Sequence, residues 1–127
     1  MKAPTSTAAK SVAILADDLI WASRLRAAVE RADAAPSVAR TVEELAHALA
    51  GGDVAAVIID LAGRSYDGVE AVRAATDSGA RVLAVGQHED LELRRSALDA
   101  GARRVFSYNK LFSDGPQVVM ALLEGKL

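Results

Sequence analysis

Short apolar runs that alternate with longer stretches of helical period constrain the fold of this chain most. Continuous apolar runs make up most of the strand-like segments at residues 12–16, 55–60 and 81–85, a weaker segment lies at 37–40, and a last one lies at 104–107. This alternation predicts repeated βα units, which form a parallel sheet. Continuous rather than alternating apolar runs are typical of strands that helices cover on both faces. We therefore expect a three-layer α/β sandwich with five parallel strands and five helices.

Capping residues mark where the helices should begin. We expect helices over residues 18–32, 41–50, 67–79 and 89–100, and a last one that has Pro116 in its first turn and runs to the end of the chain. Asp18 suits an N-cap, and Thr41 with Glu44 has the spacing of a capping box, in which each side chain satisfies a free backbone donor. Proline is favoured in a first helical turn because its missing N–H would have no partner there.

Length, charge and composition set the class of protein. The 127 residues fit one domain, which we place at 11–127 behind a lead-in at 1–10 that lacks the apolar stretch of a signal peptide. The net charge of −2 gives no basic surface for nucleic acid or an anionic membrane. The absence of cysteine excludes disulfides and zinc–thiolate sites, and is compatible with the cytoplasm.

Acidic residues end two of the apolar runs. Asp17 and Asp18 follow the run at residues 12–16, and Asp60 closes the run that begins at residue 55. Because the carboxyl ends of parallel strands share one edge of the sheet, we expect these acids in one crevice. Two like charges about 4 Å apart repel by roughly 4 kcal/mol at an effective dielectric of 20, and a hard cation such as Mg²⁺ would offset that. The structural alternatives are a helix cap for Asp18 and a solvated strand end for Asp17.

These motifs together resemble the receiver domains of two-component response regulators, over nearly the whole chain. The resemblance rests on Asp17-Asp18, on Asp60, on Asp67-Gly68 seven residues later, and on Gly101-Ala102 before the last strand. It implies a flavodoxin-like fold with strand order 2-1-3-4-5. It also implies a phosphorelay function in which Asp60 is the phosphoacceptor. Asp17, Asp18, Asp60 and the backbone carbonyl of Ala62 would then hold Mg²⁺.

The resemblance also implies partners. A histidine kinase or phosphotransfer protein would supply the phosphoryl group, and the only catalysis would be self-catalysed transfer to Asp60. The surface made by the fourth helix, the fifth strand and the fifth helix would bind a protein, for which a second copy of the chain is a candidate. A nucleotide-binding enzyme is the weaker reading, because no Gly-rich phosphate loop follows the first strand.

Three switch positions depart from the receiver pattern, at Gly86, Val105 and Tyr108. Gly86 stands where the family has a Ser or Thr hydroxyl, and Val105 where it has an aromatic residue. A hydrogen bond to a charged phosphoryl group is worth about 1.5–3 kcal/mol, against about 5.5 kcal/mol to move a two-state equilibrium from 1:99 to 99:1. Much of the switching energy is therefore missing.

The lysine that the receiver family has after its fifth strand can be matched to this chain in two registers. Tyr108 takes it in an ungapped match, whereas Lys110-Leu111-Phe112 resembles the family's Lys-Pro-Phe with two residues inserted. We favour Lys110 as the charge-neutralising group, because a shift of two residues along an extended strand keeps the same face. Arg64 stands where the family often has proline, so we also expect a more mobile loop after the third strand.

Two functions follow. The chain is either a phosphorylatable receiver domain or a pseudo-receiver, an interaction module that signals without phosphorylation. The three acids favour the first function, and Gly86, Val105 and Tyr108 favour the second.

Overall fold

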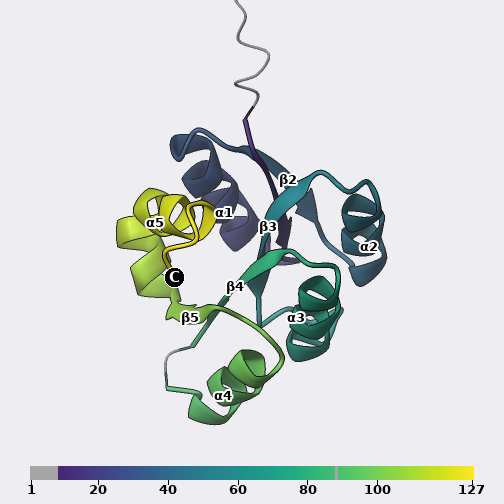
Figure 1. The fold of residues 1–127 in the computed structure, drawn as a ribbon. Helices are drawn as coiled ribbons and strands as arrows, with labels where there is room; N and C mark the ends of the chain where they lie inside the picture. Colours follow the sequence, from purple (N-terminus) through teal and green to yellow (C-terminus); the bar gives the residue numbers. More distant parts are fainter. Residues whose placement is uncertain (1–8, 88) are drawn as a thin grey trace, which may run out of the picture.

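A computed structural model describes residues 9–87 and 89–127 and shows strict alternation of strands and helices (Figure 1). The elements are β1 (Ser11–Leu15), α1 (Leu19–Arg31), β2 (Ala35–Ala39), α2 (Val42–Ala50), β3 (Val54–Asp60), α3 (Gly68–Asp77), β4 (Arg81–Gly86), α4 (Leu91–Asp99), β5 (Arg104–Ser107) and α5 (Tyr108–Leu123). The five strands are parallel, in the order β2-β1-β3-β4-β5. This confirms the predicted fold class and strand order. Most of the predicted lead-in, residues 1–8, lies outside the described part.

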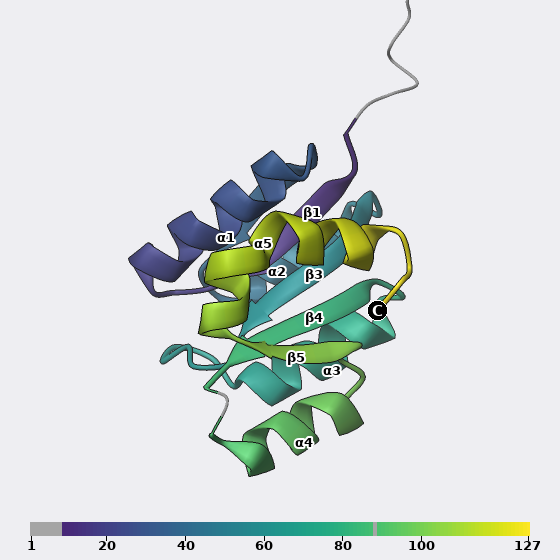
Figure 2. The same cartoon turned by 90° about the vertical axis from the view of Figure 1, so that its left-hand side faces the viewer.

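Helices cover the sheet on both faces. Figure 1 shows α1 and α5 on one side of the strands and α2 and α3 on the other, and Figure 2 shows α1 and α5 from their own side. Successive residues of one strand alternate between the two core layers, as the period of two requires. In β1, Val12 and Ile14 belong to the layer under α1 and α5, whereas Ala13 and Leu15 belong to the opposite layer.

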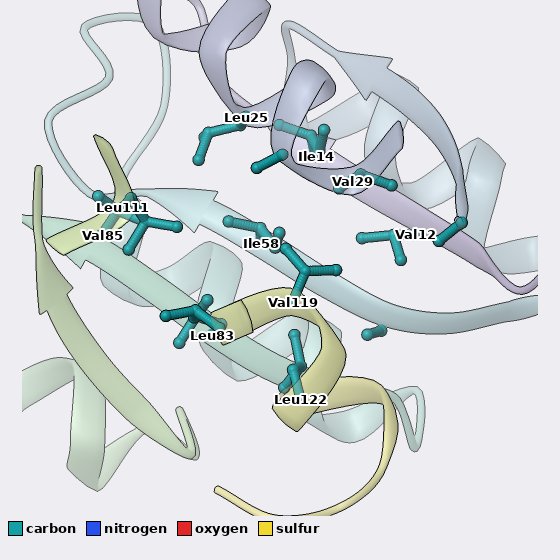
Figure 3. Close-up of a cluster of buried hydrophobic side chains, with 14 of the residues drawn as sticks. Val12, Ile14, Leu25, Val29, Ile58, Leu83, Val85, Leu111, Val119 and Leu122 are labelled. Atoms are coloured by element: carbon teal, nitrogen blue, oxygen red, sulfur yellow. The ribbon is translucent and has the colours of Figure 1, made fainter. Parts of the chain in front are cut away.

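The layer under α1 and α5 is built from large aliphatic side chains of three strands and two helices. Ile14, Ile58 and Leu83 project from β1, β3 and β4 and meet Leu25 of α1 and Val119 of α5 (Figure 3). Each of these side chains is at most 1% exposed. Full burial of one such side chain is worth about 1.5–3 kcal/mol, so this layer contributes strongly to the stability of the fold.

Helix N-termini follow the predicted caps closely. Asp18 accepts the backbone N–H of Trp21 at 2.9 Å, and Thr41 Oγ1 accepts that of Glu44 at 3.1 Å. The Glu44 carboxylate in turn accepts the N–H of Arg40, one residue before the cap, at 2.7 Å. These contacts confirm the helix starts that the sequence predicts after β1 and β2.

Helix α5 begins earlier than predicted. Ser107 caps it by accepting the N–H of Lys110 at 3.2 Å, and the helix starts at Tyr108. The backbone leaves helical geometry at Asp114, with φ −125° and ψ 24°, and Pro116 lies in the first turn after that kink. Proline is therefore placed as predicted, but within a second helical segment. The assumption that Lys110 continues an extended strand is wrong.

The edge strand β2 also differs from its prediction. It begins at Ala35 and contains Pro36, and it pairs only with β1. Proline removes one backbone donor, which an edge strand tolerates because one of its sides faces no neighbour. Within residues 9–87 and 89–127, no helix is long and apolar enough to cross a membrane.

Candidate functional site

Three acidic side chains lie at the carboxyl edge of β1 and β3. Asp60 is the last residue of β3 and only 2% exposed, whereas Asp17 and Asp18 follow β1 and reach solvent. Burial raises the pKa of Asp60, and the nearby charges of Asp18 and Asp17 raise it further. The three acids are thus close enough to interact, and Asp60 is the one shielded from water.

The hydroxyl of Tyr108 contacts Asp60 directly. Tyr108 donates a short hydrogen bond to Asp60 Oδ1, and the backbone N–H of Ala62 donates to the same oxygen at 3.0 Å. Both bonds favour the ionised carboxylate and so oppose the effect of burial on the pKa of Asp60. Burial, and then the bond to Asp60, raise the pKa of Tyr108. Tyr108 therefore meets Asp60 as a neutral donor at ordinary pH.

Lys110 makes its contacts with residues of α5 and β5. Its Nζ is 2.9 Å from Asp114 Oδ2, one turn along α5, and about 6.0 Å from the centre of the Phe106 ring. In a helix, residues two apart point in nearly opposite directions, which removes the reason for favouring this lysine. Of the two registers, the structure brings Tyr108 to Asp60.

Gly86 and Val105, two of the altered switch positions, carry no polar side chain. Gly86 is buried at the end of β4, where a Cβ would lie 3.4 Å from Leu61 Cδ1, an ordinary contact distance. Val105 is 4% exposed and packs in the layer under α2, α3 and α4. Space for a small side chain therefore exists at Gly86, but the hydroxyl that would read a phosphoryl group is missing.

Asp17 ties down the loop between β3 and α3. Its Oδ2 accepts the N–H of Arg64 at 2.9 Å, and both the N–H and the hydroxyl of Ser65 at 2.8 Å. These bonds lower the pKa of Asp17, the backbone bond from Ser65 most of all. The Ser65 hydroxyl also lies 3.2 Å from the Arg40 carbonyl oxygen. The loop expected to be more mobile is held by several hydrogen bonds.

Tyr66 connects the same loop to the ends of β3 and β1. Its hydroxyl donates to the Asp60 carbonyl oxygen at 2.6 Å and lies 3.3 Å from that of Leu15. A Cβ on Gly63 would lie 2.0 Å from the Tyr66 ring, so only glycine allows this approach. Sequence reasoning missed both Tyr66 and Ser65 as site residues. The available signal was an aromatic hydroxyl in an otherwise small, polar loop three residues after a glycine.

Trp21 joins the buried site to the surface of α1. Its ring centre lies 4.6 Å from that of Tyr108, with the planes tilted by 46°. The guanidinium of Arg24 lies 5.1 Å from the Trp21 ring and 4.9 Å from the Phe112 ring. A change at Tyr108 should therefore alter the fluorescence of Trp21.

The residues assigned to magnesium by resemblance do not fit the ion in this conformation. Among the described residues, no three acidic or imidazole side chains are grouped to hold a metal ion. One oxygen of each carboxylate is already used by hydrogen bonds, from the loop to Asp17, from α1 to Asp18 and from Tyr108 to Asp60. The crevice of about 510 Å³ beside the acids, which Ala62 also lines, has Arg40 and Arg64 on its wall. Their positive charge opposes a bound cation.

Comparisons with known structures identify the fold. The signal receiver domain of an HD domain-containing protein from Pseudomonas fluorescens has a TM-score of 0.83 and 17% identity, with 99% of this chain and 95% of that one covered. A CheY-like response regulator receiver domain protein from Methanospirillum hungatei has a TM-score of 0.81 and 18% identity, over 94% and 97%.

A third neighbour is a response regulator from Burkholderia pseudomallei whose structure contains a phosphorylated aspartic acid, a calcium ion and citrate. Its TM-score is 0.75 and its identity 18%, over 90% of this chain and 66% of that one. No protein-family model matches the sequence, and the search of curated proteins found no match. On its strand order and on these neighbours, the chain has the fold of the response-regulator receiver domains.

Proposed function

We propose that this chain is a pseudo-receiver, a signalling module that binds proteins without being phosphorylated. The observation that carries the proposal is the hydrogen bond from Tyr108 to Asp60, at the place where the resemblance expects a lysine. Phosphoryl transfer depends on positive groups that neutralise charge on the transferred oxygens. A tyrosine hydroxyl is a neutral donor, and it is hydrogen-bonded to one oxygen of the carboxylate that would attack.

Two further features support the same function. Asp60 is 2% exposed, which leaves an incoming phosphodonor little room to approach it in line. Gly86 offers a backbone N–H but no hydroxyl to report a phosphoryl group. The transfer of a phosphoryl group to Asp60 and the detection of that group are therefore both weakened. The helices and strands of the receiver fold, by contrast, are all present.

A second candidate function is the phosphorelay receiver, with Asp60 as phosphoacceptor. It is favoured by Asp17, Asp18 and Asp60 at one edge, and by the phosphorylated aspartic acid of the Burkholderia neighbour. A histidine kinase or phosphotransfer protein would be the donor. Mg²⁺ and the Lys110 ammonium would have to reach Asp60 after the loop and Tyr108 moved away.

We place partner binding on the surface formed by α4, β5 and α5, in the cytoplasm. On α4, Leu91 is 68% exposed and Leu98 is 41% exposed. Arg95 of α4 and Arg104 of β5 are exposed as well. Apolar side chains flanked by arginine are typical of protein interfaces. The partner would be another protein or a second copy of this chain.

The test is chemical phosphorylation. The intact protein is incubated with acetyl phosphate and Mg²⁺, and adducts are measured by mass spectrometry for wild type, Asp60→Asn and Tyr108→Lys. We expect no Asp60-dependent adduct in wild type, and an adduct in Tyr108→Lys, which places an ammonium beside the carboxylate. A wild-type adduct that Asp60→Asn abolishes would establish the phosphorelay function instead.

A further inference from the structure

We infer that Asp17 anchors a closed strap next to the buried Asp60 and that Asp18 caps α1, so that both acids are structural groups in place of ligands for a divalent cation. The strap is the loop of residues 61–66. This inference rests on the contacts of the strap and not on the proposed function, because the strap can be closed whether or not Asp60 ever accepts a phosphoryl group. It assigns roles to Asp17, Asp18 and Tyr66.

The first contact is the clamp at Asp17. Three donors converge on its Oδ2, two backbone N–H groups and one hydroxyl, all within 2.9 Å. A carboxylate oxygen has about two lone-pair sites, so three donors saturate it. Bonds to an ionised acceptor are shorter and roughly twice as strong as neutral ones. A cation could use this oxygen only by displacing the backbone of Arg64 and Ser65.

The second contact is the cap at Asp18. Its Oδ1 accepts the N–H of Trp21, the first turn of α1, with the extended backbone of an N-cap at φ −82° and ψ 121°. This bond orients the carboxylate along the start of the helix, whose positive end favours it. Asp18 thus has a structural role that does not involve the strap, which makes it a matched control for Asp17.

The strap is also held at both of its ends. At its start, the N–H of Leu61 donates to the Val85 carbonyl oxygen at 2.8 Å, and the Leu61 side chain is 6% exposed. At its end, the hydroxyl of Tyr66 reaches the carbonyl oxygens that close β3 and β1. Between these ends, the N–H of Ala62 in the strap donates to the Asp60 carboxylate, which also accepts the hydroxyl of Tyr108. The strap and Tyr108 thus both contact Asp60, which is only 2% exposed.

Charge in the crevice points the same way. Arg40 and Arg64 line the crevice together with Asp17 and Asp18, so the wall carries two positive charges opposite two negative ones. Magnesium binds where carboxylates concentrate negative charge and where water completes an octahedron. This wall carries charges of both signs, and one oxygen of each of its carboxylates already accepts hydrogen bonds, so negative charge is not concentrated there. The acids here stabilise the loop and the helix instead.

Amide hydrogen exchange followed by NMR tests the two anchors separately on the intact chain. Asp17→Ala is expected to speed exchange at the amides of Arg64 and Ser65 by about tenfold or more, since a bond to a charged acceptor is lost. Asp18→Ala is expected to speed exchange at Trp21 and to leave Arg64 and Ser65 unchanged. The milder Ser65→Ala, which removes one of the three donors, serves if Asp17→Ala fails to fold.

The second arm is a titration of wild type with MgCl₂ alone, read by amide chemical shifts at Asp17, Asp18 and Asp60 and by Trp21 fluorescence. We expect no saturable change. Unchanged exchange at Arg64 and Ser65 in both Asp17→Ala and Ser65→Ala would overturn the clamp. A saturable response to Mg²⁺ that Asp17→Ala abolishes would overturn the anchor role in favour of a metal site. Neither result depends on whether acetyl phosphate labels Asp60. The phosphorylation test therefore decides the proposed function independently of these two experiments.

Discussion

The Tyr108 hydroxyl and the Asp60 carboxylate stabilise each other inside the protein. Asp60 is an acid whose pKa is raised by burial, and each hydrogen bond to it lowers the cost of keeping it charged. Tyr108 supplies one bond and the backbone of Ala62 the other. The same ring packs on Trp21, which makes Tyr108 part of both the core and the site.

Tyr108→Phe should therefore destabilise the protein while it keeps the ring packing. We expect the free energy of unfolding to fall by about 1.5–3 kcal/mol, the usual worth of a hydrogen bond to a charged group. Urea unfolding followed by Trp21 fluorescence measures it. In an Asp60→Ala background the same substitution should cost clearly less, because the partner is gone. Equal costs in both backgrounds would mean that the bond contributes nothing.

At the scale of an element, the strap depends on the pairing of Gly63 with Tyr66. A Cβ at position 63 would overlap the ring, and the ring carries the hydroxyl that closes β3. Gly63→Ala should cost about 1–3 kcal/mol in the free energy of unfolding, as overpacking usually does. With Tyr66→Ala already present the clash has no partner, so adding Gly63→Ala should cost little. A double-mutant cycle by urea unfolding measures this coupling, and additive costs would show that the ring does not approach Gly63.

Elements differed in how well the sequence predicted them, for physical reasons. Strands β1, β3 and β4 were predicted within a residue, because burial on both faces requires continuous apolar runs. The start of α5 was missed, because Ser107 is a good cap but the following Tyr108-Asn109-Lys110 has no strong helical signal. Lys110 was assigned to the site on that error.

The site itself was predicted in part. Acids that close strands are visible in a sequence, since strand ends of a parallel sheet share an edge. The clamp from Arg64 and Ser65 to Asp17 was not visible, because two of its three donors are backbone N–H groups that every residue carries. Which oxygen a loop occupies depends on tertiary geometry.

At the scale of the whole molecule, Asp17 and Asp60 make the stability of the fold depend on pH in opposite directions in the acid range. The pKa of Asp17 is lowered in the folded state, so its contribution is present above about pH 4 and lost as pH falls. The pKa of Asp60 is raised, so its protonated form is favoured by folding and stability falls as pH rises above about 4. The two effects oppose each other, and acid titration of the wild type separates them poorly.

The pH dependence of stability in the alkaline range is easier to interpret, because Tyr66 and Tyr108 act in the same direction. Burial raises the pKa of both Tyr66 and Tyr108 above the usual value near 10, so folding favours their protonated forms. Their contribution is complete below about pH 10 and is lost as pH rises from there towards the folded pKa values, because only the unfolded chain releases these protons. The double variant Tyr66→Phe/Tyr108→Phe should be less stable than wild type at pH 7 and should lose less stability between about pH 9 and 11. Urea unfolding at a series of pH values measures the difference between the two proteins, which cancels every group common to both. Parallel curves would mean that these hydroxyls titrate freely and that the edge of the sheet is open to water.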